Sequence, residues 1–294
     1  MRDAGHTLGA VLTTRNAEIF SDGTFEFVHV VERIPWPKHG YTGATWHDAL
    51  ASAYDASYDV ALIPSEEPQA YTFARKAAIP QRVGFYNGWQ KPFKSWWARG
   101  ELTRAVYRPA SPPRVPRHEC EVLFELGTGL HDERTPTRDL SRLRPCVLDH
   151  PPQRRPAIVQ LTAKWLARGR DEALVAGWLR ERRARGACTA IAARAESELA
   201  LRLAADAGLS LELCDSVRDW KAIVAGADVL ITPDSGAAHV AGMVGTPCVD
   251  LFEAADFERQ RDRWRPWAGP ACELPFPTTP AQREAFSEKL FWRA

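Results

Sequence analysis

The sequence has little of what marks membrane-spanning, secreted or nucleic-acid-binding proteins. No apolar run approaches the ~20 residues that a membrane helix needs, and the first ten residues, MRDAGHTLGA, do not resemble a signal peptide. The six cysteines are scattered without a CxxC pair, which argues against disulfides or a zinc site and favours a reducing compartment. A net charge of +1 gives no overall attraction for nucleic acid. The sequence therefore predicts a cytoplasmic protein that binds no nucleic acid.

What the chain does have is an alternation of strand-like and helix-like segments in both halves. Its 294 residues exceed one ordinary core and predict two domains. Because strands alternate with amphipathic helices, we expect an α/β fold with mostly parallel sheets. The expected organisation is an N-terminal Rossmann-like domain over 1–145, a proline-containing linker over 146–155, a second Rossmann-like domain over 156–280 and a closing helix over 281–294.

One stretch, ADVLITPDSGAAHVAGMVGTPCVDLF over 227–252, combines a buried strand with chemically active residues. In open α/β sheets, ligands bind beyond the carboxyl ends of the strands, where Asp234 stands. The next helix begins with free N–H groups and a positive dipole end, which attract anions. Ser235 can cap that helix or donate to a phosphate, Gly236 lets the backbone approach a ligand, and His239 lies one turn further on. The pattern predicts a cradle for a diphosphate.

A simpler interpretation exists for each of these residues alone. Asp234 or Ser235 would cap a helix, and His239 would be an ordinary core histidine. A serine hydrolase is a weaker alternative, because Ser235 does not stand in a G-x-S-x-G turn and His239 is only one helical turn away. The combination of the residues, rather than any one of them, favours the cradle.

The pattern D-S-G-x-x-H-x-A-x-x-x-G-x-P, from Asp234 to Pro247, resembles the signature of glycosyltransferase family 9, the lipopolysaccharide heptosyltransferases. RVGF over 82–85, HECEVLFELG over 118–127 and W-x-P over 264–266 resemble further family motifs. The resemblance implies a GT-B fold: two Rossmann-like domains with the active site in the cleft between them. The nucleotide-sugar would bind the C-terminal half and the acceptor the N-terminal half.

The resemblance also implies a set of nucleotide-sugar-binding residues. The donor would be ADP-heptose, with no further cofactor. No D-x-D pair is positioned for a metal, so we expect metal-independent chemistry. Lys164 stands on a shorter loop than in the family, and Glu253 replaces a usual glycine. Three residues of the implied set have simpler interpretations. Lys164 would be a solvated surface lysine, and Glu196 and Glu198 would only favour the start of a helix. The implied set is Asp234, Ser235, Gly236, His239, Thr162, Lys164, Glu196 and Glu198.

The implied activity is inverting transfer of a sugar, heptose by resemblance, to a lipopolysaccharide-core or related glycan. A base would take a proton from the acceptor hydroxyl. The family's presumed base follows a first strand and a G-D pair that have no match here, so we expect one βα unit of roughly 20–40 residues upstream of Met1. Glu66 and Glu67 are fallback candidates for the base, although exposed loop carboxylates are the simpler interpretation.

Two other functions fit the same fold. One is a non-catalytic nucleotide-sugar-binding protein, and the other is a nucleotide-sugar epimerase that needs no acceptor. An upstream strand with its G-D loop would favour the transferase over the binding protein, and release of the nucleotide without acceptor would favour the epimerase.

The segment from Tyr86 to Pro109 mixes tryptophans with basic residues. Tryptophans favour membrane interfaces and basic residues attract phosphates, so we expect a glycolipid or oligosaccharide acceptor and peripheral contact with the inner membrane. Core tryptophans with solvated charges are the alternative interpretation. The residues concerned are Trp89, Trp96, Trp97, Lys91, Lys94, Arg99 and Arg104.

Overall fold

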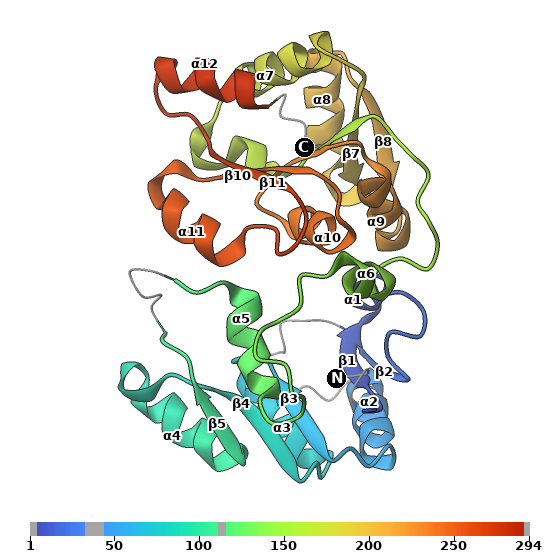
Figure 1. Cartoon of the computed structure of the whole chain (residues 1–294), viewed down its shortest axis with the longest axis vertical. Coiled ribbons are helices and arrows are strands. Elements are labelled where there is room, and N and C mark those ends of the chain that lie inside the picture. The colour runs from blue at the N-terminus through green and yellow to red at the C-terminus, as the bar shows by residue number, and fades with distance from the viewer. Residues whose placement is uncertain (1–4, 33–43, 111–115, 291–294) are drawn as a thin grey trace. The chain divides into compact units, whose positions relative to one another are not determined.

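The computed structural model describes residues 5–32, 44–110 and 116–290 and divides the chain into two compact units (Figure 1). Unit 1 comprises Met1–Ala17 and Asp22–Pro136, and unit 2 comprises Glu18–Ser21 and Thr137–Ala294. The second unit thus begins before the expected linker over 146–155, and it takes one short segment from near the start of the chain. The expected closing helix is part of unit 2, and its last residues, 291–294, lie outside the described residues.

Unit 2 contains one parallel sheet of six strands in the order β11-β10-β9-β6-β7-β8. The alternation of strand-like and helix-like segments predicts such a sheet, although the segment of β11, ACELP, is short and ends in proline. The strands are β6 (Ala157–Gln160), β7 (Cys188–Ala193), β8 (Ser210–Cys214), β9 (Leu230–Pro233), β10 (Cys248–Phe252) and β11 (Ala271–Pro275).

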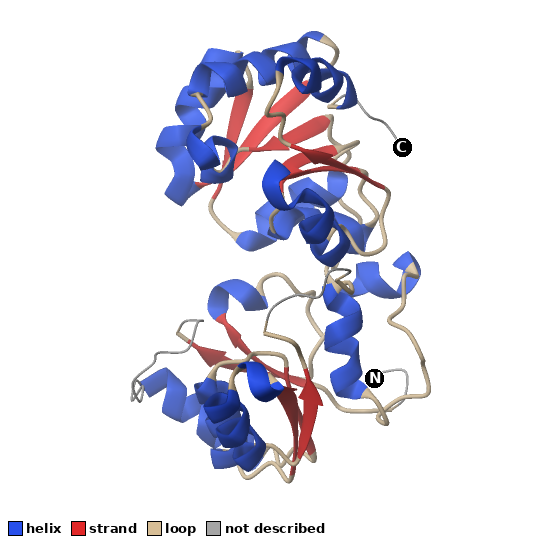
Figure 2. Cartoon of the chain, turned by 90° about the vertical axis from the view of Figure 1, so that its left-hand side faces the viewer, coloured by secondary structure: helices blue, strands red, loops and turns tan. Residues whose placement is uncertain are grey.

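Helices cover both faces of this sheet (Figure 2). Successive strand residues point to opposite faces, so Val159 and Ile231 pack beneath α7, α8 and α12, while Leu230 packs beneath α9 and α10. The helices of unit 2 are α6 (Leu140–Leu143), α7 (Glu172–Ala184), α8 (Ser197–Ala207), α9 (Val217–Gly226), α10 (Gly236–Val244), α11 (Phe257–Trp264) and α12 (Pro280–Lys289).

Unit 1 departs from the single parallel sheet that the alternation predicts. Its strands form two parallel sheets, β1-β2 and β3-β4-β5. Val11 of β1 and Ala61 of β3 pack against the same apolar cluster, but in the described residues these two strands are not paired. The strands are β1 (Gly9–Thr13), β2 (Phe27–Val31), β3 (Val60–Ile63), β4 (Gln81–Tyr86) and β5 (Arg104–Tyr107).

The helices of unit 1 are α1 (Thr14–Ala17), α2 (Ala44–Asp55), α3 (Pro68–Lys76), α4 (Pro92–Glu101) and α5 (Glu119–Phe124). The HECEVLFELG segment is α-helical only to Phe124 and continues as a 3₁₀ turn to Gly127. Across the described parts of both units, no helix combines the length and apolarity needed to cross a membrane.

Candidate functional site

The carboxyl end of β9 leads directly into α10 through Ser235. The Ser235 backbone is extended, and its Oγ accepts a hydrogen bond of 3.3 Å from the N–H of Ala237, which caps the helix. The same Oγ donates to Gln160 Oε1 at 3.0 Å and lies 2.9 Å from Thr232 Oγ1. Sequence reasoning missed Gln160 and Thr232, although a polar residue at or next to the end of each otherwise apolar strand was a usable signal. This network fixes where the helix begins.

The first turn of α10 is open at Gly236. A Cβ there would meet only Trp220, at an ordinary contact distance of 3.9 Å, so packing does not demand a glycine. Gly242 is different, because its Cβ would lie 2.8 Å from the backbone N of Trp267. The absent side chain of Gly236 therefore leaves room beside the first N–H groups of the helix. His239 follows one turn later, half-buried, with its ring centroid 6.1 Å from that of Trp264.

Lys164 joins the loop after β6 to the loop after β9. Thr162 caps the 3₁₀ segment Ala163–Gly169 by accepting from the Lys164 N–H at 3.3 Å. The ammonium of Lys164 donates to the backbone carbonyl of Asp234. The Asp234 N–H donates to the Leu251 carbonyl at 2.8 Å, and its carboxylate has no hydrogen-bond partner among the described residues. A cation and an anion thus stand beside the start of α10.

Glu253, the departure from the family's glycine, holds the Lys164 loop. Its carboxylate accepts two hydrogen bonds from Arg170, at 2.8 and 2.9 Å. Arg170 also donates to the carbonyls of Trp165 and Lys164, at 2.8 and 2.6 Å, and stacks 3.7 Å above the Phe276 ring. Sequence reasoning noted Glu253 but did not foresee its partner. The Arg170–Glu253 pair therefore holds the Lys164 loop in one conformation.

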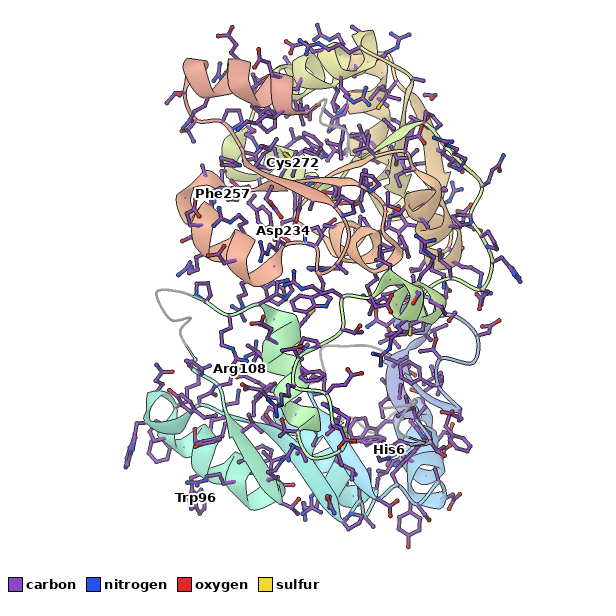
Figure 3. The ribbon with its side chains drawn as sticks, in the orientation of Figure 1. His6, Trp96, Arg108, Asp234, Phe257 and Cys272 are labelled. Carbon is purple, nitrogen blue, oxygen red and sulfur yellow. The ribbon has the colours of Figure 1, made fainter. Side chains whose placement is uncertain are left out.

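Glu196 connects the loop after a third strand, β7, to the site. Its Oε1 accepts from the Ala163 N–H at 3.0 Å, so the loop after β7 meets the loop after β6. Glu196 and Glu198 line an open hollow of about 370 Å³ at the start of α8, together with Ser197 and Arg202. The predicted residues of unit 2 therefore lie in the loops and helix starts that follow three neighbouring strands, β7, β6 and β9. Figure 3 labels Asp234 within this unit.

A buried carboxyl lies beneath the site. Asp250 of β10 stands opposite Thr232 and Glu273, is fully buried, and has no hydrogen-bond partner for either oxygen among the described residues. Burial raises its pKa well above the usual value, and the charges of Asp234 and Glu273 act in the same direction. Burial therefore favours the protonated form of Asp250. Sequence reasoning treated its segment only as a strand.

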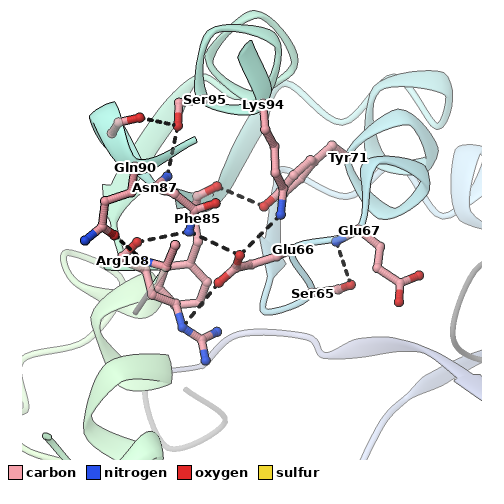
Figure 4. Close-up of polar contacts among 12 residues, drawn as sticks. Ser65, Glu66, Glu67, Tyr71, Phe85, Asn87, Gln90, Lys94, Ser95 and Arg108 are labelled. Atoms are coloured by element: carbon pink, nitrogen blue, oxygen red, sulfur yellow. Dashed lines mark hydrogen bonds and ion pairs between the residues drawn. The ribbon is translucent and has the colours of Figure 1, made fainter. Parts of the chain in front are cut away.

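The two fallback bases lie in unit 1, at the carboxyl edge of β3-β4-β5 (Figure 4). The Glu66 carboxylate accepts from Asn87 and Lys94, each at 3.2 Å, and lies 3.4 Å from Arg108. Burial would raise the pKa of Glu66, but the hydrogen bonds and the two cations outweigh it and lower the pKa. A carboxylate with a lowered pKa is a weak base. Glu67 precedes α3 and directs its side chain away from this cluster (Figure 4).

Comparison with known families bears on the site in unit 2. Residues 165–285 match glycosyltransferase family 9 (heptosyltransferase). The matched stretch, less than half of the chain, is thus similar to a glycosyltransferase family 9 domain. The resemblance inferred from the signature is thereby confirmed. No curated protein matches the chain in sequence.

Solved structures extend the likeness to both units. Heptosyltransferase WaaC of E. coli with ADP shares 16% identity over 95% of this chain and 88% of its own, with a TM-score of 0.66. The E. coli ADP-heptose lps heptosyltransferase II shares 13% identity over 96% of this chain and 87% of its own, also at 0.66. A family 9 glycosyl transferase from Veillonella parvula DSM 2008 shares 13% over 96% and 79%, at 0.65. The expected GT-B fold is thus confirmed.

Proposed function

We propose that this protein is an inverting glycosyltransferase that moves a sugar from a nucleoside diphosphate donor to a glycolipid or oligosaccharide acceptor. By its family, the sugar is heptose, the donor is ADP-heptose, and the acceptor is a lipopolysaccharide core or a related glycan. The observation that carries the proposal is the junction of β9 and α10, where Lys164 meets the Asp234 carbonyl beside an open helix start.

The donor would bind this junction through its diphosphate. The N–H groups at the start of α10 would donate to phosphate oxygens, with Gly236 leaving room for them. Lys164 is held by an uncharged carbonyl, so its positive charge stays available for the diphosphate. Thr162 shapes the Lys164 loop, and the hollow at Glu196 and Glu198 would take the nucleoside.

The chemistry would be a single displacement at the anomeric carbon. As the bond to the diphosphate breaks, negative charge grows on the leaving oxygen, and the helix N–H groups, Lys164 and His239 would stabilise it. The Asp234 carboxylate would accept hydrogen bonds from hydroxyls of the donor sugar. We expect the reaction to need no metal, because the sequence has no D-x-D pair positioned for one. Transfer that persists in EDTA is the check.

A specific observation also favours a second function, non-catalytic binding of nucleotide-sugars. Glu66 is paired with Lys94 and Arg108, and its pKa is lowered, so it is a poor acceptor for the proton of an incoming hydroxyl. A binding protein needs the unit 2 site but no base. Incubation with labelled ADP-heptose and heptose-free lipopolysaccharide separates the two functions, because only the transferase moves label to the lipid.

The proposal is tested first by Asp234→Ala. Removing the carboxylate should reduce affinity for ADP-heptose by at least roughly a hundredfold, since a charged group in a binding site loses several hydrogen bonds at once. Affinity for ADP should fall less, because the sugar is absent. Isothermal titration calorimetry with both ligands measures the difference.

Asp228→Ala is the matched control. Asp228 precedes β9 and forms an exposed pair with Arg154 at 3.0 Å, so its loss should leave both affinities unchanged. Undiminished affinity of the Asp234 variant for ADP-heptose would overturn the assignment of the donor site.

A further inference from the structure

Helix α4 of unit 1 separates its residues into two faces. Ser95 and Ala98 are buried against the unit, and Trp97 is half-buried with its ring 5.9 Å from that of Tyr71. Lys94 also turns inward, to the Glu66 carboxylate. The inward face is thus fully accounted for by packing and ion pairing.

The outer face carries three aromatic side chains with almost no cover. Trp89, in the turn before α4, is 95% exposed, Phe93 is 88% exposed and Trp96 is 79% exposed. Phe93 and Trp96 are three residues apart and lie on one side of α4, and Trp89 lies in the separate 3₁₀ turn Gly88–Gln90. Trp97, which sequence reasoning grouped with them, is instead part of the packed face. Figure 3 labels Trp96 on this helix.

Two basic residues accompany these aromatics. Lys91 and Arg99 are both exposed, and the Arg99 guanidinium lies 5.1 Å from the centre of the Tyr86 ring. The outer face is therefore apolar and cationic at once. We call Trp89, Lys91, Phe93, Trp96 and Arg99 the α4 face.

We propose that the α4 face docks on an anionic phospholipid bilayer. Tryptophan prefers the headgroup level of a membrane, where its ring is apolar and its N–H can meet water. Lysine and arginine beside it attract anionic headgroups. A short helix with aromatics on one side and cations at its margins can lie in the plane of the interface without crossing it. Charge and apolar contact thus point to the same occupant.

Binding to the bilayer would bring unit 1 close to lipid-anchored glycans, the acceptor class of the proposed function, on which this step rests. The inward side of α4 carries Lys94 to the carboxyl edge of β3-β4-β5, beside Glu66. A helix lying on the bilayer would therefore keep that edge close to the headgroups of lipid-anchored glycans. Binding to the bilayer itself requires neither donor nor transfer.

The test is co-sedimentation of the full chain with vesicles of phosphatidylcholine alone and of phosphatidylcholine with phosphatidylglycerol. The wild type should bind the anionic vesicles, less tightly at high salt. The triple variant Trp89→Ala, Phe93→Ala, Trp96→Ala should bind them roughly tenfold less or weaker, because apolar contact is lost. Lys91→Gln with Arg99→Gln should lose about fivefold for each basic residue removed.

Tyr54→Ala and Lys76→Glu are the matched controls. Tyr54 is 58% exposed on α2, and Lys76 is exposed at the end of α3, so both change the surface outside the α4 face and should leave vesicle binding unaltered. Unchanged circular dichroism of every variant shows that the fold persists.

Three results would overturn the inference: a wild type that ignores anionic vesicles, a triple variant that binds as the wild type does, or sedimentation velocity showing that the face closes a stable dimer. ADP affinity is measured in parallel. If ADP does not bind but vesicles do, the proposed function fails while the membrane face stands.

Discussion

The two units place polar side chains at the carboxyl ends of parallel strands, yet the two edges differ in kind. In unit 1, Glu66 faces Lys94 and Arg108, and Arg108 also pairs with Glu119, so the charges neutralise one another. In unit 2, uncharged groups fix the start of α10, and among the described residues the Lys164 ammonium donates only to a carbonyl. Strand edges of similar geometry can therefore be closed by ion pairs or left ready for a charged ligand.

The sheets to which these two edges belong differ as well. In unit 2, β9 has a hydrogen-bonded neighbour on each side, β6 and β10. The position of the first residue of α10, which follows β9, is therefore fixed by the sheet. In unit 1, the strands are divided between two sheets. We propose donor binding at the edge of unit 2 and a structural role for the ion pairs of unit 1. Each assignment can be broken by substitution.

The largest effect is expected from Arg108→Ala in unit 1. The change leaves Glu119, whose side chain is 10% exposed, and Glu66 without their shared cation. Removing one partner of a buried pair costs about 3–5 kcal/mol, because the remaining charge stays buried. Thermal and urea unfolding should report that loss, while ADP affinity of the folded protein should remain at the wild-type value.

Arg154→Ala is the control for the Arg108 variant. The Arg154 side chain is 88% exposed in its pair with Asp228, and such surface pairs contribute less than about 1 kcal/mol. If Arg108→Ala is no more harmful than Arg154→Ala, the ion pairs of unit 1 are not structural, and the contrast between the two edges collapses.

A smaller effect, of opposite sign, is expected from Asp250→Asn in unit 2. Burial raises the pKa of Asp250 in the folded state, so folding favours the protonated form. The resulting stability is fully present below the unfolded pKa of about 3.9 and is lost as pH rises toward the folded pKa. Asparagine does not ionise and should raise Tm by roughly 2–4 °C at about pH 8, with little change at about pH 4.

Calorimetric scans across pH measure this dependence, with Asp228→Asn as an exposed control. A Tm that falls in the Asp250 variant at high pH, but not at low pH, would mean that the ionised carboxylate stabilises unit 2. The buried acid would then be a paired charge, and unit 2 would resemble unit 1 after all.

The local structure of the proposed donor edge was largely predictable from sequence, because its signal is local. The strand before Asp234, the capping Ser235 and the small-residue helix lie within a few residues of one another, as do the alternating segments of β6 to β10. The pattern from Asp234 to Pro247 as a whole indicates a family, which none of its residues indicates alone. The general plan of unit 2 follows from these features.

The partners of those residues were not predictable, because they depend on register between distant segments. Arg170 and Glu253 are 83 residues apart and meet only because β6 and β10 flank β9. The division of the unit 1 sheet depends on which strands pair, and hydrophobic alternation does not specify that. Short strands such as RAVY and ACELP give too little periodicity to be distinguished from loops.

The smallest effect is expected from Glu253→Gln, which tests whether the unit 2 edge needs an ion pair of its own. The amide can accept only one of the two hydrogen bonds from Arg170 and carries no charge. Because Arg170 also holds the Lys164 carbonyl, the loop should loosen and ADP affinity should fall about three- to tenfold. Calorimetric titration with ADP measures the change.

Asp256→Asn is the control, since Asp256 follows the same strand and pairs with Arg259 at 2.7 Å in an exposed position. Its ADP affinity should match the wild type. If Glu253→Gln lowers Tm but leaves ADP affinity intact, the Arg170 pair supports the fold without positioning Lys164, and the two edges would then use their ion pairs alike. If affinity falls while Tm holds, the pair acts on the loop, because a purely structural contact would change stability first.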